Sequence, residues 1–224
     1  MKLEGFYIDS FSIVISAKQN NPTILNPDFL RINKIVPEKM KLTETVTTPI
    51  FSMAKYSLLE SGEKDREGDI TITVEPEKLQ LLESCGGVFW DKYISLGVVK
   101  EYITTLEHVQ YTGLGINWQA FFEQSDPDKW LSERFIKDGN WRTDKNKVRA
   151  VSIKLAFDIE DATCFISLDQ IKFKETPGIS IDINFHHSPK DIRFEIDKLK
   201  TLIDRWPLLQ KNLISSLKRL FYWE

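Results

Sequence analysis

The sequence predicts an α+β protein with an antiparallel or mixed sheet that carries its helices mainly on one face. Between positions 149 and 187, three runs of alternating apolar and polar residues follow one another with no helical segment between them. Strands that succeed each other in this way pair antiparallel. Apolar residues spaced three or four apart predict a long C-terminal helix, and Pro207 lies inside that pattern. We therefore expect the C-terminal helix to be interrupted at Pro207.

Composition and charge indicate an ordinary soluble globular protein. Of the 224 residues, 42% are hydrophobic and 28% are charged, no internal repeat is visible, and we expect a single domain over 1–224. The net charge of −3 argues against a surface built for nucleic-acid phosphates. Acidic residues interrupt the start of the chain, and no run approaches the roughly eighteen apolar residues of a membrane span. We expect a cytoplasmic protein without membrane contact, and the Lys-, Ile- and Asn-rich texture favours a bacterial source.

The first half of the chain is expected to alternate strands with short helices. Asn26 is a good helix cap, and Pro27 suits the first helical position. Pro49 and Pro76 lack a backbone donor, so each interrupts or ends a strand. The expected elements are a strand over 6–16, a helix over 28–34, a Thr-rich strand over 41–57, a strand over 70–74 and a helix over 92–106.

The segment from Val109 to Trp118 is expected to be a central strand. Its alternation places Gly113 and Gly115 on one face with Tyr111. Two glycines on one face leave room for a backbone, a helix or a ligand to come close. A nucleotide-binding loop is excluded, because Trp118 occupies the third glycine position and no helix follows directly.

The second half is expected to hold a helix, a three-stranded meander and the C-terminal helix. Ser125 can cap a helix that ends near Lys137, and Ser188 with Pro189 can start the last one. Between them we expect strands over 149–159, 164–174 and 179–185. The apolar phase changes at Asp169-Gln170, which predicts a β-bulge there.

One pattern in the meander points to metal-dependent nuclease chemistry. Asp158 lies on one strand, and Gln170 and Lys172 lie on the next. A carboxylate and an amide can hold Mg²⁺, and a lysine two residues beyond the amide can position or activate water. The alternative is that the charged members of this set form an ordinary solvated face.

A second pattern points to nucleic-acid contact. Trp141 lies in a polar loop with Arg142, Lys145 and Lys147, so that its ring could stack on a base while the cations meet phosphates. Two aspartates in the same loop dilute that positive charge, and an ordinary exposed loop is the alternative.

The histidines and cysteines indicate neither a metal site nor a cofactor. His186 and His187 are adjacent on a strand, so their rings point to opposite faces and cannot easily chelate one ion. Cys85 and Cys164 are expected to be buried free thiols.

The chain ends on three consecutive aromatic residues, Phe221, Tyr222 and Trp223. A helix turns about 100° per residue, so it cannot bury all three on one side. Exposed aromatics are typical anchors for a partner protein or a second copy, whereas docking on the protein's own sheet is the alternative.

These patterns favour a non-enzymatic binding or interaction protein, an adaptor or a subunit of a larger bacterial assembly. No combination of catalytic residues stands out, so an enzyme is the less favoured class. The first alternative is a metal-dependent nuclease that uses Asp158, Gln170 and Lys172. The second is a protein with a small-ligand pocket between the sheet and its helices, beside Gly113 and Gly115.

Overall fold

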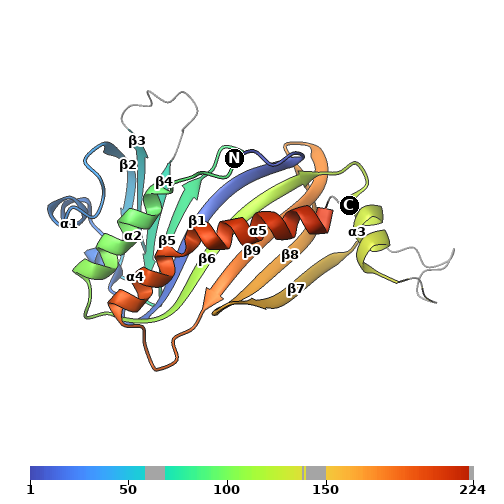
Figure 1. Cartoon of the computed structure of the whole chain (residues 1–224). Helices are drawn as coiled ribbons and strands as arrows, with labels where there is room; N and C mark the ends of the chain where they lie inside the picture. Colours follow the sequence, from blue (N-terminus) through green and yellow to red (C-terminus); the bar gives the residue numbers. More distant parts are fainter. Residues whose placement is uncertain (59–68, 138, 140–149, 222–224) are drawn as a thin grey trace.

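Nine strands form one antiparallel sheet in the computed structural model, which describes residues 1–58, 69–137, 139 and 150–221 (Figure 1). The order across the sheet is β2-β3-β4-β5-β1-β6-β9-β8-β7. The strands are β1 (Phe6–Lys18), β2 (Met40–Thr47), β3 (Ser52–Leu58), β4 (Ile70–Glu75), β5 (Lys78–Ser84), β6 (Gln110–Glu123), β7 (Ser152–Ile159), β8 (Ala162–Phe173) and β9 (Thr176–His187).

The helices are not all packed on one face of this sheet. They are α1 (Pro27–Ile32), α2 (Ile94–Thr105), α3 (Pro127–Phe135), α4 (Ile196–Asp204) and α5 (Trp206–Phe221), with a short 3-10 turn at Pro22–Ile24. Figure 1 shows α2, α4 and α5 in front of the strands, whereas α1 and α3 lie beside the two ends of the sheet. The predicted α+β class with an antiparallel sheet is confirmed. The C-terminal helix is divided at Arg205, two residues before Pro207, so the expected interruption is confirmed.

The chain order repeats across the centre of the sheet. Each half consists of a long strand, a helix, an antiparallel meander and a further helix: β1, α1, β2 to β5 and α2 in the first half, and β6, α3, β7 to β9 and α4 with α5 in the second. The two long strands β1 and β6 pair antiparallel in the middle. The two halves thus share an order of strands and helices without sharing a visible sequence repeat. This is possible because strands and helices are specified by the spacing of apolar and polar residues and not by particular residues.

Two strands in the first half depart from the expectation. The segment 41–57 is a hairpin, because the backbone reverses from Thr48, whose N–H donates to the carbonyl of Phe51 at 2.8 Å. The sequence pattern does not predict strand β5, since the adjacent Leu81 and Leu82 break the alternation that marks a strand. In the structure Leu81 is buried, whereas Leu82 is exposed on the other face.

A β-bulge also changes the face on which Tyr111 lies. The register of β1 with β6 shifts between Ser16 opposite Gly113 and Ala17 opposite Tyr111. The extra residue turns Tyr111 to the helix-covered side, where its hydroxyl donates to the carbonyl of Leu106 at 3.1 Å. The prediction that Tyr111 shares a face with the glycines is therefore wrong.

The three-stranded meander is confirmed as β7, β8 and β9, but it lacks the predicted bulge. The register of β8 with β9 runs unbroken from Thr163 to Phe173. The apolar phase changes because Phe173 packs on the uncovered face, its ring centre 5.3 Å from that of Tyr7 and 5.2 Å from that of Phe121.

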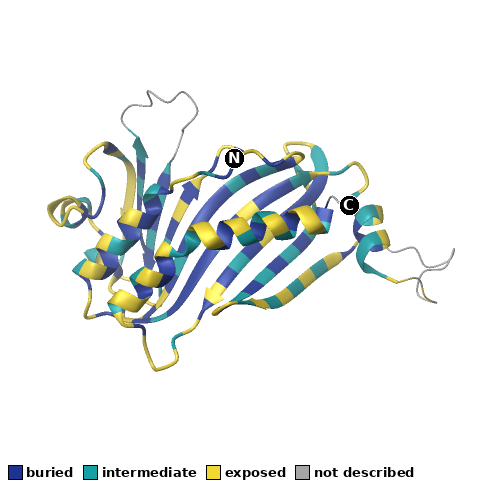
Figure 2. Ribbon diagram, in the orientation of Figure 1, coloured by how far each residue is buried: buried dark blue, intermediate teal, exposed yellow. Residues whose placement is uncertain are grey.

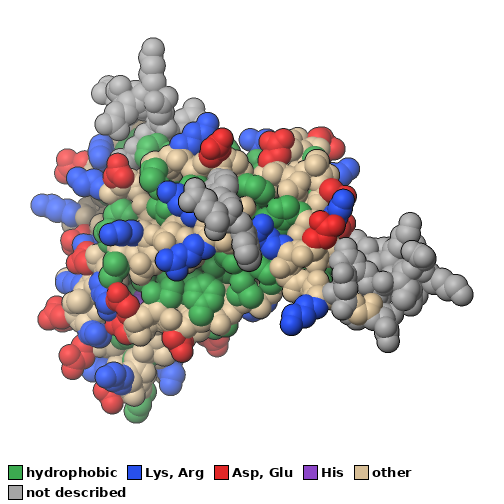
Figure 3. All heavy atoms as spheres, turned by 45° about the vertical axis from the view of Figure 1, so that its right-hand side comes forward, with side chains coloured by type: hydrophobic (Ala, Val, Ile, Leu, Met, Phe, Trp, Pro, Cys, Tyr) green, Lys and Arg blue, Asp and Glu red, His purple; other side chains and the backbone are tan. Residues whose placement is uncertain are grey.

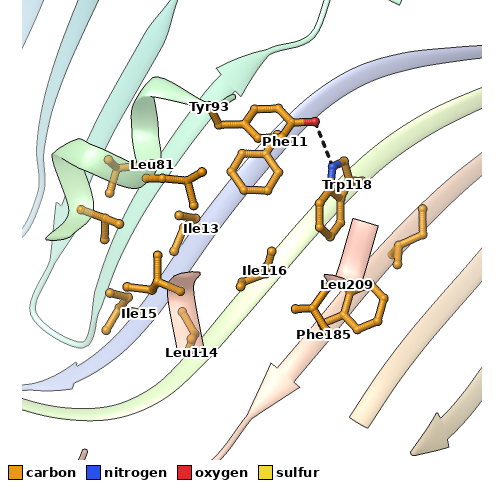
Figure 4. Close-up of a cluster of buried hydrophobic side chains, with 14 of the residues drawn as sticks. Phe11, Ile13, Ile15, Leu81, Tyr93, Leu114, Ile116, Trp118, Phe185 and Leu209 are labelled. Atoms are coloured by element: carbon orange, nitrogen blue, oxygen red, sulfur yellow. Dashed lines mark hydrogen bonds between the residues drawn. The ribbon is translucent and has the colours of Figure 1, made fainter. Parts of the chain in front are cut away.

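The core lies between the sheet and α2, α4 and α5. Figure 2 shows the inward-facing residues buried and the outer sides of the helices exposed. At its centre, Phe11 stacks on Tyr93 with ring centres 3.9 Å apart, and Trp118 Nε1 donates to the Tyr93 hydroxyl at 3.2 Å (Figure 4). That hydroxyl donates in turn to Gln210 of α5 at 3.0 Å. Helix α5 is thereby tied to the middle of the sheet.

Candidate functional site

The face of the sheet opposite α2, α4 and α5 carries side chains in transverse rows. Antiparallel register places residues of β5, β1, β6, β9, β8 and β7 side by side. One row is Ser84, Ser10, Gln119, Asp182, Ser167 and Lys154. The next is Leu82, Ser12, Asn117, Asn184, Phe165 and Ala156. This uncovered surface is called the open face below.

These rows line a hollow of about 470 Å³. Most of the lining side chains bear hydroxyl, amide or carboxyl groups, and apolar ones are in the minority. The lining side chains are Ser10, Ser12, Val14, Gln80, Leu82, Asn117, Gln119, Lys154, Phe165, Ser167, Asp182 and Asn184. They come from strands in both halves of the chain, so the hollow exists only because β1 and β6 join the halves.

Hydrogen bonds between the strands hold the floor of the hollow in place. Asn117 Nδ2 donates to the carbonyl and the hydroxyl of Ser12, both at 3.3 Å. Asn184 donates to Asn117 Oδ1, and Gln119 Nε2 donates to Asp182 Oδ1 at 3.0 Å. Side-chain amides have two donor hydrogens and an oxygen with two lone pairs, so each keeps capacity for a further partner.

Gly113 and Gly115 lie on the open face, away from the helices. A Cβ on Gly115 would lie 3.1 Å from Asn184 Nδ2, and one on Gly113 would lie 3.2 Å from Ser16 Oγ. The glycines therefore make room for neighbouring polar side chains. We expected a ligand pocket between the sheet and its helices, beside these glycines. That placement is wrong, because both glycines lie on the opposite face of the sheet.

Aromatic and cationic groups meet on the open face, at the hollow and beyond it. Lys154 Nζ lies 5.7 Å from the centre of the Phe165 ring, and Lys174 Nζ lies 5.6 Å from that of Tyr7. Both are cation–π distances. The hollow thus combines hydrogen-bonding groups with one aromatic ring and one charge of each sign, Lys154 and Asp182.

The structure does not bring Asp158, Gln170 and Lys172 together. Asp158 pairs with Thr163 at the hairpin end of β8, whereas Gln170 and Lys172 lie seven and nine residues further along β8. At a rise of about 3.3 Å per residue, these separations are roughly 23 and 30 Å. Asp158 also points to the open face and the other two to the opposite one, since Thr163 and Gln170 differ in phase. These three residues cannot hold one metal ion.

The described residues also contain no metal site built from histidine, cysteine or acidic side chains. No group of three or more His, Cys, Asp and Glu side chains in those parts of the chain is arranged to hold an ion. His186 and His187 point to opposite faces, as expected. His186 is exposed on the open face, where its Nε2 lies 3.0 Å from Ser188 Oγ, and His187 is buried.

Both cysteines are free and buried, as predicted. Burial raises the pKa of Cys164 to about 12, and burial together with the nearby Glu83 raises that of Cys85. Both thiols therefore stay protonated near neutral pH and are weak nucleophiles.

Of the three consecutive aromatic residues at the end of the chain, the structure describes only Phe221. Phe221 is 6% exposed, and its ring stacks on Trp130 at 4.9 Å and contacts Phe6 and Phe122. Phe221 thus packs against the protein's own sheet and α3. The other predicted anchors, Tyr222 and Trp223, lie outside the described residues.

The predicted nucleic-acid contacts Trp141, Arg142, Lys145 and Lys147 also lie outside the described residues. On the side of the molecule seen in Figure 3, basic and acidic side chains are interspersed. That view gives no extended basic area among the described residues.

The fold and the open face define this chain as an α+β protein with a nine-stranded antiparallel sheet that has α2, α4 and α5 over the middle of one face. No family model matches the sequence, and no curated protein matches it either. Among solved structures, comparison finds that of DynU16, a protein in the dynemicin biosynthetic locus. The two share 12% identity over 88% of this chain and 93% of the other, with a TM-score of 0.29. None of the helices in the described residues has the length and apolarity to cross a bilayer.

Proposed function

We propose that the protein is a non-enzymatic binding protein that holds a small, neutral, polar ligand in the hollow of the open face. The observation that carries this proposal is the pair of transverse rows, which aim hydroxyl and amide groups of β1, β6, β9 and β8 into one concavity. Rows set by sheet register are rigid, and a rigid array of donors and acceptors loses little entropy on binding.

The chemistry of the lining favours a neutral ligand. Lys154 and Asp182 contribute opposite charges, and the remaining polar groups are uncharged. Amide and hydroxyl groups both donate and accept, so they match a ligand that also does both, such as a sugar or a nucleoside. The volume of about 470 Å³ lies in the range of roughly 300–1,000 Å³ that is typical of small-molecule sites.

The test is a thermal-unfolding screen of the intact chain with neutral sugars and nucleosides. A ligand present at one hundred times its Kd stabilises the folded state by about 2.7 kcal/mol. For a chain of this length that corresponds to a rise of roughly 5–10 °C in Tm. We expect at least one compound of this class to give such a shift, and Asn184→Ala to abolish it.

The matched control is Asn212→Ala, because Asn212 is equally half-buried but lies on α5, on the other side of the sheet. It should leave the ligand-induced shift unchanged. The proposal fails if no neutral compound shifts the Tm, or if Asn184→Ala and Asn212→Ala respond alike.

A second candidate function is self-association as part of an assembly. Strand β7 is the last strand in the sheet order, and its inward-facing apolar side chains Ile153, Leu155, Phe157 and Ile159 are only half-buried. Figure 3 shows hydrophobic side chains at the surface on this side of the molecule. A second copy that pairs its own β7 antiparallel would continue the sheet and cover this strip.

The molecular mass in solution tests this second candidate. If β7 is the interface, light scattering gives the mass of a dimer, and Phe157→Ser shifts it to a monomer. Phe51→Ser, in the β2–β3 turn, serves as the control and should leave the dimer intact. A monomeric wild-type protein would contradict the candidate.

A further inference from the structure

One inward-facing row of side chains extends across the sheet to its β2–β3 end. Register aligns Trp118, Phe11, Glu83, Ile70, Tyr56 and Leu42 across β6, β1, β5, β4, β3 and β2. Helix α2 packs mainly on β1 and β5, in the middle of the sheet. The outermost members, Tyr56 and Leu42, instead face α1 and the connection 33–39 across a pocket.

This pocket is lined by apolar side chains of the sheet and of the connection that follows α1. Its volume of about 440 Å³ lies within the range of roughly 300–1,000 Å³ that is typical of small-molecule sites. Val36, Met40 and Tyr56 are buried, and Leu42 lies directly opposite Tyr56 in the pairing of β2 with β3. The pocket is separate from the open face, because these side chains point to the other side of the sheet.

Backbone hydrogen bonds hold the wall that faces the sheet. The N–H of Ile35 donates to the carbonyl of Leu30 at 2.9 Å, and the N–H of Met40 donates to the carbonyl of Pro37 at 3.0 Å. Leu30 and Ile35 are buried in the core, which anchors the end of α1. A pocket with walls fixed in this way is formed before a ligand arrives, so little entropy is lost on binding.

Tyr56 lines this pocket with a hydroxyl group that has no partner. The residue is 6% exposed, and its hydroxyl makes no hydrogen bond within the described residues. A buried polar group without a partner is destabilising, so such a group in a native fold calls for an explanation. Burial raises the pKa of Tyr56, so the hydroxyl stays protonated near neutral pH and can donate. An oxygen atom of a ligand would supply the missing acceptor.

The charged side chains at the rim of the pocket favour a neutral ligand. They are two acids, Asp28 and Glu38, and two cations, Arg31 and Lys34. All four are exposed, and Asp28 accepts from Arg31 at 3.0 Å. The rim therefore carries no net charge, and the buried lining carries no charged group that could pair with an ion.

The lining also favours an aromatic ligand. The thioether of Met40 is polarizable and makes favourable contacts with aromatic rings. The ring of Tyr56 can pack against a second ring in an offset or edge-to-face arrangement. Val36 and Leu42 add branched aliphatic surface on which a flat ring can lie.

We propose that this pocket binds a small, neutral aromatic molecule with one oxygen acceptor. The ring lies among Val36, Met40 and Leu42, and the oxygen accepts a hydrogen bond from the Tyr56 hydroxyl. This site is independent of the function proposed for the open face, where the ligand is mainly polar.

Acetophenone is the probe for the experiment, and the methionine methyl groups are the reporters. The chain has three methionines: Met40 lines the pocket, Met53 lies on the open-face side of β3, and Met1 begins the chain. In the intact chain with ¹³C-labelled methionine methyl groups, we expect acetophenone to shift the Met40 resonance saturably. The resonances of Met1 and Met53 should stay in place.

Three related compounds test the parts of the ligand class. Isopropylbenzene, which lacks the oxygen, should bind about fivefold more weakly, the effect of one hydrogen bond. Cyclohexyl methyl ketone, which lacks the aromatic ring, should bind about threefold more weakly. Benzoate, which is charged, should produce no saturable shift of Met40.

Two tyrosines provide a matched pair of variants. Tyr56→Phe should weaken acetophenone binding about fivefold and leave isopropylbenzene binding unchanged, because only the ketone meets the hydroxyl. Tyr102→Phe should leave both affinities within twofold, because Tyr102 is equally buried but lies on α2, outside the lining. Leu42→Trp should fill the pocket and abolish the Met40 shift.

Five results would contradict the proposal. A Met40 signal that no neutral aromatic moves would show that the pocket is unused, and equal shifts of Met40 and Met53 would indicate general adsorption. Benzoate binding as tight as that of acetophenone would exclude a neutral ligand, and equal binding of cyclohexyl methyl ketone would exclude an aromatic one. Equal losses in Tyr56→Phe and Tyr102→Phe would remove the role of the Tyr56 hydroxyl. If Leu42→Trp does not fold, the tyrosine pair still decides the result.

Discussion

At the scale of single residues, the two halves of the chain treat their buried ionisable groups differently. Glu83 caps the first turn of α2 with three hydrogen bonds. The acid nearest to His187, by contrast, is Asp161, whose Oδ1 lies 3.8 Å from Nδ1, beyond hydrogen-bond distance. The difference affects stability, because a hydrogen bond to a charged group contributes about 1.5–3 kcal/mol and an unmatched polar group costs a similar amount.

The capping role of Glu83 can be tested by removing its carboxylate. Glu83→Ala leaves the N–H groups of Ile94 and Ser95 without their acceptor inside the protein. We expect the free energy of unfolding, measured with urea, to fall by about 2–4 kcal/mol. Glu75→Ala is the control, since Glu75 makes an exposed ion pair with Lys78, and it should change the stability by less than about 0.5 kcal/mol.

The burial of His187 predicts a pH dependence of stability. Because its pKa is lowered in the folded state, the unfolded chain binds a proton first as the pH falls. Its contribution to stability is therefore complete above the unfolded pKa of about 6.5 and is lost as the pH falls from there toward the folded pKa. His187→Gln should remove that part of the slope between pH 7 and 5. An identical slope in wild type and variant would contradict this origin.

At the scale of elements, the close pairing of β9 with its neighbours depends on Gly178. A Cβ at this position would lie 2.4 Å from two ring carbons of Phe121 and 2.4 Å from the backbone oxygen of Phe122. The backbone oxygen belongs to the paired strand β6 and cannot turn aside. Only glycine fits there without a shift of one strand.

Two glycine-to-alanine changes should therefore have opposite effects. Gly178→Ala should destabilise the protein by about 1–3 kcal/mol, because it overpacks the contact between β9 and β6. Gly97→Ala should stabilise it by about 0.5–1 kcal/mol, because Gly97 is exposed in α2 with open space around its Cα. Chemical unfolding of both variants measures the two signs. Destabilisation by both would show that a methyl group at position 97 does meet neighbouring atoms.

At the scale of the whole molecule, the halves share a sheet and a core. The β1–β6 pairing extends from Phe6 opposite Phe122 to Lys18 opposite Gln110, so each half alone would leave one edge of its central strand unpaired. The aromatic set of Phe11, Tyr93 and Trp118 also spans both halves (Figure 4).

This sharing predicts that the halves unfold together. In native-state hydrogen exchange, the slowest amides of β4 in the first half and of β8 in the second should report one opening free energy, equal to that of global unfolding. A lower opening free energy for one half would show that it unfolds alone, and the expectation of one domain over 1–224 would fail.

The sequence by itself determined the class of the fold, the β7–β9 meander and the division of the C-terminal helix just before Pro207. These follow from the spacing of apolar residues and from the missing donor of proline, both of which act over a few neighbouring residues. Only the tertiary structure decided that Lys78–Ser84 is a strand, that Tyr111 turns inward at a bulge, and that Asp158 lies far from Lys172. It also decided that the polar rows meet in a hollow and that Tyr56 faces an apolar pocket. Each of these depends on strand order and register, which are set by contacts between segments far apart in the chain and leave no local pattern in the sequence.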